Sequence, residues 1–281
     1  MPKPKIIAVV GPTASGKSAL GSFLAQKLGG EVIAADSRQV YRGMRVISRA
    51  EPGHMVGVAD PRRQYSAGQY QKAAAKICSS VLQNTGIPIV VGGTGFYADA
   101  LLRGGLPQVA PNPALRAALN KKTQKQLLAQ LAKLDPASAA RVDPHNKVRL
   151  VRAIEIAKAL GKVPPTGTTD NKYDVLWLGL PRSKNLAAGV EGRLGRGMLA
   201  EAKKLRTRLS KKRYAELGFE FDLLADYLDK KISKKELVEK IANGERKYAK
   251  RQMRWFKRSK EIFWVTGKAQ ALRLAKKHLS R

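Results

Sequence analysis

The sequence predicts an α/β fold in which a parallel sheet is flanked by helices and a helical domain is inserted. Three observations carry this prediction. Short apolar segments of strand length occur at 5–10, 31–35 and 87–91, separated by segments with helical spacing. The stretch 107–165 shows helical spacing almost without strand patterns. Strand character then returns at 173–180, which indicates that the chain rejoins the same sheet.

The same patterns divide the chain into three parts. Residues 1–106 form the first part of the α/β core, 107–165 the helical insertion, and 166–281 the return to the core with a strand and basic C-terminal helices. A Pro- and Thr-rich linker at 164–169 closes the insertion. The other expected elements are helices at 17–28, 66–83, 115–134, 137–141, 148–160, 219–228, 233–258 and 269–279, a basic segment at 184–209 and a short strand at 262–265.

Length and composition bound the class of protein. With 281 residues and a hydrophobic fraction of 43%, the chain is long and apolar enough for a globular core. Its single cysteine, Cys78, cannot form an intramolecular disulfide, and three histidines do not favour a zinc site. The sequence has no signal-peptide pattern and no apolar run of membrane-spanning length, so we expect a cytoplasmic protein.

The segment Gly11–Ser18 matches the phosphate-binding loop pattern G-x-x-x-x-G-K-[ST] at every fixed position. A strand pattern precedes it and a helix pattern follows, which is the context that a P-loop NTPase-like sheet requires. Backbone N–H groups of such a loop point at a phosphate. The helix N-terminus and Lys17 add positive charge, and the Ser18 hydroxyl can bind Mg²⁺. The sequence therefore predicts binding of a diphosphate or triphosphate group.

The charge balance indicates a polyanionic partner. The chain carries 54 Lys and Arg against 21 Asp and Glu, a formal net charge of +33. A field this positive is typical of proteins that bind the phosphate backbone of nucleic acids. An anionic membrane surface or a uniformly basic proteome would also account for the charge. Neither explains a chain that carries a phosphate-binding loop as well.

Two further segments follow strands of the predicted sheet. Asp36 follows the strand 31–35, and ligands of open α/β sheets bind beyond the carboxyl ends of strands, so Asp36 is expected to face the phosphate loop. An Asp that only caps the next turn is the alternative. Gly92-Gly93-Thr94-Gly95 stands after the strand 87–91, where hydrolytic P-loop enzymes usually carry an Asp. This disfavours a motor or GTPase and indicates that a substrate approaches bare backbone, with a structural tight turn as the alternative.

Basic and aromatic side chains alternate in the helix pattern at 233–258. Its cations near the end are Arg246, Lys247, Lys250, Arg251, Arg254, Lys257 and Arg258. A solvated polar face is the ordinary explanation of such a pattern. On a chain with this net charge, we expect contact with nucleic acid phosphates instead.

Taken in order, these segments resemble the bacterial tRNA dimethylallyltransferases. That family transfers the dimethylallyl group of dimethylallyl diphosphate to the exocyclic amine of the adenine 3′-adjacent to the anticodon. The matching segments span nearly the whole chain: GPTASGKS at 11–18, DSRQVYRGM at 36–44, GGTGFYADALL at 92–102, VRLVRAIE at 148–155 and YAKRQMRWFKR at 248–258. The segment between Met44 and Asp60 is shorter than is usual in the family, and the helix around Arg193 is trimmed.

The resemblance implies roles for residues at the matching positions. Asp36 would be the general base for the adenine amine, Thr94 would contact the substrate near the transfer centre, and Lys17 would stabilise the leaving diphosphate. The implied diphosphate ligands are Gly11, Thr13, Ala14, Ser15, Gly16, Lys17, Ser18 and Arg193, with Ser18 also binding Mg²⁺. The implied tRNA contacts are Asp36, Ser37, Arg38, Gln39, Thr94, Arg116, Val148, Arg149, Leu150, Val151, Arg152, Arg246, Lys250, Arg251 and Gln252.

The implied partners are the anticodon stem-loop of tRNA and dimethylallyl diphosphate, and we expect a monomer without membrane contact. Two other functions stay open from the local motifs alone. A small-molecule kinase that uses ATP also combines a phosphate loop, an Asp after the second strand and a Gly-rich turn after the third. Such a kinase has no use for a net charge of +33. An interaction module that binds RNA and a nucleotide without chemistry is the other function, and the position of Asp36 argues against it.

Overall fold

The computed structural model describes residues 2–164, 172–181 and 186–280. The chain divides into two compact units. Unit 1 comprises Met1–Arg103 and Asn171–Arg281, and unit 2 comprises Gly104–Asp170. The predicted α/β class is confirmed, because unit 1 is built on a parallel sheet flanked by helices.

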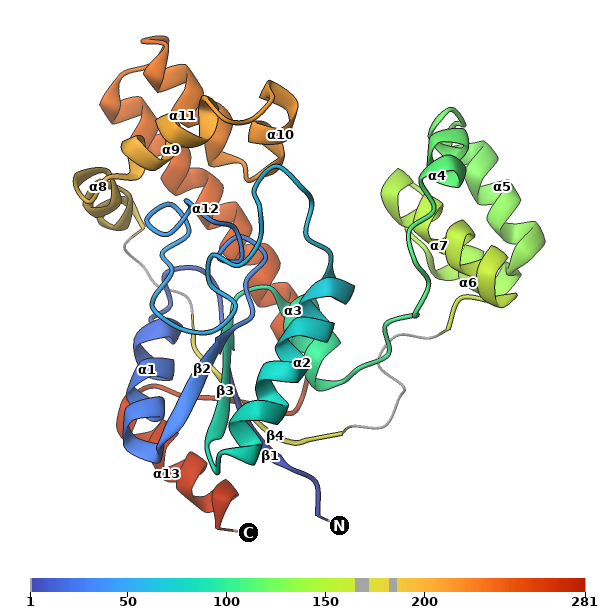
Figure 1. The fold of residues 1–281 in the computed structure, drawn as a ribbon. Coiled ribbons are helices and arrows are strands. Elements are labelled where there is room, and N and C mark those ends of the chain that lie inside the picture. Colours follow the sequence, from blue (N-terminus) through green and yellow to red (C-terminus); the bar gives the residue numbers. More distant parts are fainter. Residues whose placement is uncertain (1, 165–171, 182–185, 281) are drawn as a thin grey trace. The chain divides into compact units, whose positions relative to one another are not determined.

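The sheet of unit 1 has the strand order β2-β3-β1-β4-β5, and every neighbouring pair is parallel. The strands are β1 (Lys5–Val10), β2 (Gly30–Ala34), β3 (Ile87–Gly92), β4 (Asp174–Gly179) and β5 (Ile262–Trp264). In the register of the three central strands, Val9 lies beside Val91 of β3 and Leu178 of β4. The carboxyl ends of the strands therefore meet at one edge, which Figure 1 shows below the loops that follow β1 and β2.

Alternating residues of the strands fill two cores. Ile7 and Val9 contribute to the core that includes residues of α1 (Lys17–Leu28) and α13 (Lys268–Leu279). Ile6 and Ala8 point to the opposite face, whose core includes residues of α2 (Ala67–Gln83) and α3 (Gly95–Leu102). Both faces are thus covered, as the near-continuous apolar strand sequences predict for a parallel sheet.

The rest of unit 1 is helical: α8 (Ala187–Gly195), α9 (Met198–Arg206), α10 (Lys211–Glu216), α11 (Glu220–Leu228) and α12 (Lys234–Phe256). The basic segment predicted at 184–209 is two helices, because the backbone of Gly197 is left-handed (φ 101°) and begins α9; residues 184 and 185 lie outside the described residues. The short α10 was not predicted. Ser233 and Glu236 form the capping box that starts α12.

Unit 2 consists of four helices within the described residues: α4 (Pro113–Asn120), α5 (Gln124–Leu134), α6 (Pro136–Arg141) and α7 (Lys147–Leu160). The continuous helical run predicted over 115–134 is wrong, because Thr123 caps a new helix through its bond to the N–H of Gln126. The core of the unit includes Leu127 and Leu150. The predicted insertion, 107–165, falls within this unit, and 165–169 of the predicted linker lie outside the described residues.

Among the described residues, no helix is long and apolar enough to cross a membrane.

Candidate functional site

The topology brings three loops of unit 1 to the same edge of the sheet. The phosphate loop follows β1, Asp36 follows β2, and Thr94 follows β3, with β3 lying between β2 and β1. The backbone ties these loops together, since the N–H of Thr94 donates to the Ala35 carbonyl at 3.2 Å. Ligands of open α/β sheets bind at this position.

The phosphate loop has the backbone that anion binding requires. Gly16 is left-handed (φ 87°) and precedes α1 without a side-chain cap, so the first N–H groups of the helix are left for a ligand. At Gly11 (φ 156°) a Cβ would lie only 2.9 Å from the Leu180 carbonyl oxygen. The hydroxyl of Ser15 is buried and has no hydrogen-bond partner in the part of the chain that the structure describes. An unpartnered buried hydroxyl beside free N–H groups fits a phosphate group.

Lys17 is buried within this loop. Its Nζ donates to the Pro12 carbonyl at 3.2 Å. Burial lowers the pKa of Lys17, the Asp36 carboxylate opposes that change, and the charge of Arg49 adds to it. A buried ammonium next to a second cation is stabilised strongly when an anion arrives.

Asp36 uses one of its oxygens to hold the following turn. Oδ1 accepts the N–H of Arg38 at 3.0 Å and the N–H of Gln39 at 3.4 Å. The capping alternative is therefore present in the structure. Among the described residues, Oδ2 has no hydrogen-bond donor, so the same carboxylate has an oxygen left to accept a proton.

Thr94 and Tyr248 lie beside Asp36. Oγ1 of Thr94 accepts the N–H of Ser37 at 3.0 Å and donates to the Ser37 hydroxyl at 3.2 Å. Burial raises the pKa of Tyr248 to about 12, and the nearby Asp36 carboxylate adds to the rise. Tyr248, which also hydrogen bonds to Thr94, stays a neutral phenol at physiological pH. The sequence showed Tyr248 only as one aromatic residue of a basic helix, so its place in the site was missed.

Gln252 of α12 joins two of the loops. Its Oε1 accepts the N–H of Thr13 at 2.8 Å, and its Nε2 donates to the Gly93 carbonyl at 2.8 Å. A Cβ on Gly93 would lie 2.4 Å from Nε2, so the glycine makes room for the amide. At Gly93 the bare backbone after β3 is thus approached by one of the protein's own side chains. Since Gln252 is buried, the structure assigns it a bridging role in place of the expected tRNA contact.

Arg193 lies deeper than its expected role at the diphosphate requires. It is almost fully buried, its Nη2 pairs with Glu245 Oε1 at 2.6 Å, and its Nη1 donates to the Ile47 carbonyl at 2.9 Å. Its Nε donates to the Gly189 carbonyl at 3.2 Å. All three guanidinium nitrogens therefore have protein partners, which corrects the sequence expectation of a direct diphosphate ligand.

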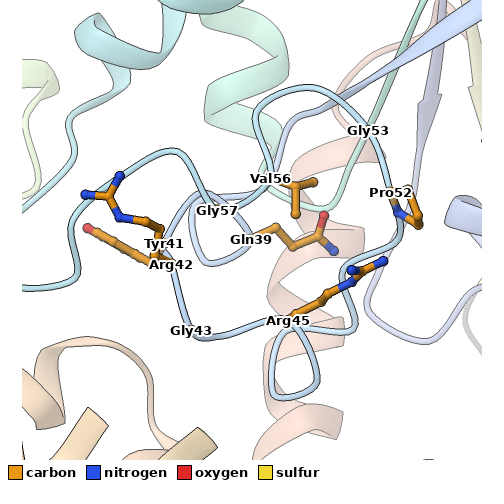
Figure 2. Close-up of a pocket in the computed structure, with 9 residues that line it drawn as sticks. All are labelled: Gln39, Tyr41, Arg42, Gly43, Arg45, Pro52, Gly53, Val56 and Gly57. Atoms are coloured by element: carbon orange, nitrogen blue, oxygen red, sulfur yellow. The ribbon is translucent and has the colours of Figure 1, made fainter. Parts of the chain in front are cut away.

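The segment expected to contact tRNA after β2 is only partly available. Arg38 pairs with the buried Glu220; burial lowers the pKa of Arg38, but the Glu220 and Asp36 carboxylates outweigh it and leave the pKa raised. Gln39 is one of the residues that line a pocket of about 400 Å³, and Figure 2 shows its side chain between those of Val56 and Arg45. Its Nε2 donates to the carbonyls of residues 48 and 49 at 3.2 and 3.4 Å, which fixes the loop that forms the pocket.

The outer face of α12 carries the expected cations. Arg246, Lys250 and Arg251 are exposed, whereas Ala249 and Phe256 on the other face are buried. None of these three cations forms an ion pair within the described residues. A face of unpaired cations on one helix is suited to a phosphate backbone.

The residues of unit 2 that were expected to contact tRNA fall into three groups. Leu150 and Val151 are buried in the core of the unit, so their side chains cannot contact RNA, and that part of the expectation is corrected. Val148 and Arg149 are exposed. The remaining two, Arg116 and Arg152, are paired with the carboxylate of Glu155.

Fold and site together define an α/β P-loop protein whose phosphate loop lies beside a carboxylate and a helix with unpaired cations. This arrangement suits transfer of a group from a phosphate ester to a nucleophile that a base deprotonates. A family model described as IPP transferase matches residues 39–259. The chain belongs to this family, and the resemblance inferred from the sequence is confirmed.

Similar proteins extend the match over nearly the whole chain. A tRNA dimethylallyltransferase of Pelotomaculum thermopropionicum is 34% identical over 285 residues, which cover 94% of this chain and 91% of that protein. A tRNA dimethylallyltransferase of Anaeromyxobacter dehalogenans is 34% identical over 283 residues, which cover 93% of this chain and 94% of that protein.

Solved structures of similar proteins share the fold. The tRNA isopentenylpyrophosphate transferase of Bacillus halodurans is 28% identical, with a TM-score of 0.70 over 99% of this chain and 97% of that one. A eukaryotic dimethylallyltransferase acting on tRNA is 26% identical, with a TM-score of 0.80 over 93% of this chain and 73% of that one. These matches favour the transferase over the kinase that the local motifs left open.

Proposed function

We propose that this protein transfers the dimethylallyl group from dimethylallyl diphosphate to the exocyclic amine of the adenine 3′-adjacent to the anticodon in tRNA. The observation that carries the proposal is the meeting of the phosphate loop, Asp36 and Thr94 at one edge of the sheet. The names of the similar proteins support it. The protein acts as a monomer in the cytoplasm, where it binds the anticodon stem-loop.

The diphosphate lies in the phosphate loop. Its oxygens accept the N–H groups at the start of α1 and the Ser15 hydroxyl, which have no side-chain partner among the described residues. They also accept the Lys17 ammonium, whose Nζ lies in the same loop and donates to the Pro12 carbonyl. The Ser18 hydroxyl would hold Mg²⁺, and the bound ion would neutralise charge on the diphosphate. Among the described residues there is no cluster of three or more acidic, His or Cys side chains that could hold a metal by itself.

The transfer step uses the phosphate loop at one end of the site and Asp36 at the other. The nitrogen of the adenine amine forms a bond to the allylic carbon, the carbon–oxygen bond breaks, and its electron pair stays on the diphosphate. Lys17 and the loop N–H groups stabilise that charge. The proton of the amine passes to the free Oδ2 of Asp36, whose other oxygen is fixed by two backbone N–H groups. Thr94 and Tyr248 fix the loop beside the base.

Replacement of Asp36 tests this mechanism. Asp36→Asn keeps the turn, since the amide oxygen still accepts the two N–H groups, but removes the proton acceptor. We expect the single-turnover rate to fall by about 10²–10⁴-fold, with the affinities for tRNA and dimethylallyl diphosphate nearly unchanged. Asp60→Asn is the matched control, because the hydrogen bonds of the Asp60 carboxylate go to Arg62 alone among the described residues.

Two outcomes would contradict the assignment. A single-turnover rate of Asp36→Asn within a few-fold of the parent means that Asp36 only caps the turn. Restoration of the rate by added Mg²⁺ means that the carboxylate supports the metal. Transfer of label from ATP, but not from labelled dimethylallyl diphosphate, to an acceptor would overturn the proposed function itself.

A further inference from the structure

Arg49 is held in an unusual backbone conformation close to the phosphate loop. Its φ of 56° lies in the left-handed region, which residues with a side chain rarely adopt. The surrounding loop enforces it: the N–H of Arg49 donates to the Val46 carbonyl at 3.2 Å, and Gln39 Nε2 donates to the Arg49 carbonyl at 3.4 Å. The carboxylate of Glu201 accepts the N–H groups of Val46 and Ile47. Strained backbone that is this firmly held is typical of functional positions.

The guanidinium of Arg49 lies between the phosphate loop and a buried carboxylate. Nη1 is 3.5 Å from the Thr13 hydroxyl oxygen, and Nη2 pairs with Glu245 Oε2 at 2.9 Å. The charge of Arg49 also contributes to the lowered pKa of Lys17. The side chain is one-fifth exposed (20%), so part of it is accessible to a ligand in the loop.

This cluster has an excess of positive charge. Glu245 is one carboxylate, and it faces two guanidinium groups, those of Arg49 and Arg193. All three nitrogens of Arg193 have protein partners, whereas Nε of Arg49 donates to no described group. Unbalanced positive charge at a largely desolvated site is stabilised when an anion binds. Arg49 is the member of the cluster that can meet one.

A glycine makes room for the Arg49 guanidinium. Gly189 lies inside α8, where glycine is the least favourable residue after proline. A Cβ on Gly189 would lie 3.0 Å from Arg49 Nη2 and 3.6 Å from its Cζ. The glycine therefore has a packing reason, since a larger side chain at 189 would push the guanidinium away from Glu245 and Thr13.

We propose that Arg49 is a further ligand of the diphosphate, positioned by Glu245 and accommodated by Gly189. This inference rests on the proposed function, because it gives Arg49 a place in the same diphosphate site. The planar fork of a guanidinium matches two phosphate oxygens, which a lysine ammonium cannot do. On bond cleavage Arg49 stabilises the charge that develops on the leaving diphosphate. Arg193 pairs with the other oxygen of Glu245 and so keeps that carboxylate in place.

The affinity for inorganic diphosphate, measured by titration calorimetry in the presence of Mg²⁺, tests the proposal. Arg49→Met keeps most of the side-chain length and removes the charge, and we expect affinity about 10–100-fold weaker. Arg49→Lys should recover part of the loss. Arg45→Met is the matched control, because it removes the same charge from the same loop on the exposed side, and its diphosphate affinity should stay within about two-fold.

A second variant separates ligand binding from folding. Gly189→Leu changes no charge and improves the helix propensity of α8, but it occupies the space of the guanidinium. We expect it to weaken diphosphate affinity by at least about five-fold, since it removes one charged hydrogen-bonding group from the anion, while tRNA affinity in a filter-binding assay stays unchanged. If Arg49→Met fails to fold, Gly189→Leu carries the test alone.

Lys17→Ala distinguishes this proposal from the proposed function. If Lys17→Ala weakens diphosphate binding and both Arg49→Met and Gly189→Leu leave it unchanged, Arg49 is a structural residue and the inference is overturned. If Lys17→Ala also leaves binding unchanged, the loop does not hold diphosphate, and the proposed function fails together with the inference.

Discussion

Glu155 is the carboxylate that holds the side chains of Arg116 and Arg152 in unit 2. It is buried in unit 2, and its carboxylate accepts the Asn112 N–H at 2.6 Å and the Nε and Nη2 of Arg116 at 2.9 and 2.7 Å. Arg152 pairs with the same carboxylate. Burial raises the pKa of Glu155, but the hydrogen bonds from Arg116, Asn112 and Arg152 outweigh burial and lower it to about 2. Glu155→Gln removes the charge and keeps the shape.

The pKa gives an upper limit for the stability that this charge contributes. A fall from the ordinary value of 4.5 to about 2 corresponds to about 3 kcal/mol, since one pKa unit is about 1.4 kcal/mol. Water screens both arginines, whose side chains are 38% and 33% exposed, so about 1–2 kcal/mol is the realistic contribution. Because the pKa is lowered in the folded state, the contribution is complete above about pH 4.5 and is lost as the pH falls towards 2.

Hydrogen exchange of peptides from unit 2 measures this effect. No Trp, Tyr or Phe lies within 104–170, so intrinsic fluorescence reports only on unit 1 and serves as an internal control. At pH 7 the free energy of opening of unit 2 should fall by about 1–2 kcal/mol in Glu155→Gln, and this difference should shrink below pH 4.5. Asp143→Asn, at an exposed carboxylate of the same unit, should change it by less than about 0.5 kcal/mol. A difference between Glu155→Gln and the parent that stays constant from pH 7 to pH 3 would refute the reasoning.

Two further predictions concern α12. Replacement of Lys250 and Arg251 by Gln should reduce the slope of log tRNA affinity against log salt by about 1.5–2, because two phosphate contacts are lost; the same change at Lys276 and Lys277 of α13 is the control, and an equal reduction there would show that only net charge matters. Gln252→Ala leaves an N–H of the phosphate loop and a carbonyl after β3 without partners, so unit 1 should lose about 1–3 kcal/mol in urea unfolding followed by Trp fluorescence. If Gln252→Ala left the stability unchanged and weakened tRNA binding, Gln252 would contact the RNA as first expected.

The sequence was sufficient wherever local pattern and global fold agree. The phosphate loop has a fixed spacing between a strand and a helix, and the strand before it is apolar because both faces are buried. Asp36 and Thr94 could be placed for the same reason, since the carboxyl ends of parallel strands meet at one edge. These positions follow from topology and need no knowledge of side-chain packing.

The positions that the sequence could not place depend on tertiary contacts between distant segments. Glu245 is one acidic residue in a basic helix, and nothing local distinguishes it from an ordinary solvated partner at i,i+4 spacing. Only the fold brings Arg49 and Arg193 to it across 196 and 52 residues of chain. Leu150 and Val151 were expected at the RNA because the family resemblance implies contact along the whole segment 148–152, yet the helical period turns them into the core. The left-handed Arg49 has no sequence signature at all.

Buried glutamates hold arginines in both units of this strongly basic chain. Glu155 holds Arg116 and Arg152, Glu220 holds Arg38, and Glu245 holds Arg49 and Arg193. With 54 basic and 21 acidic residues, the chain has charge enough to attract a polyanion without any fixed geometry. The paired arginines cost less conformational entropy when a ligand binds, because they are already held in place.

The two explanations of tRNA affinity predict opposite signs for one substitution. Glu155→Gln raises the formal net charge from +33 to +34. If the long-range field alone determined affinity, tRNA binding would become slightly tighter. If fixed arginines matter, binding becomes weaker, because Arg116 and Arg152 lose the carboxylate that orients them. Affinity at constant salt and pH 7, measured while hydrogen exchange shows unit 2 still folded, separates the two. A tighter complex would mean that Glu155 serves only the stability of unit 2.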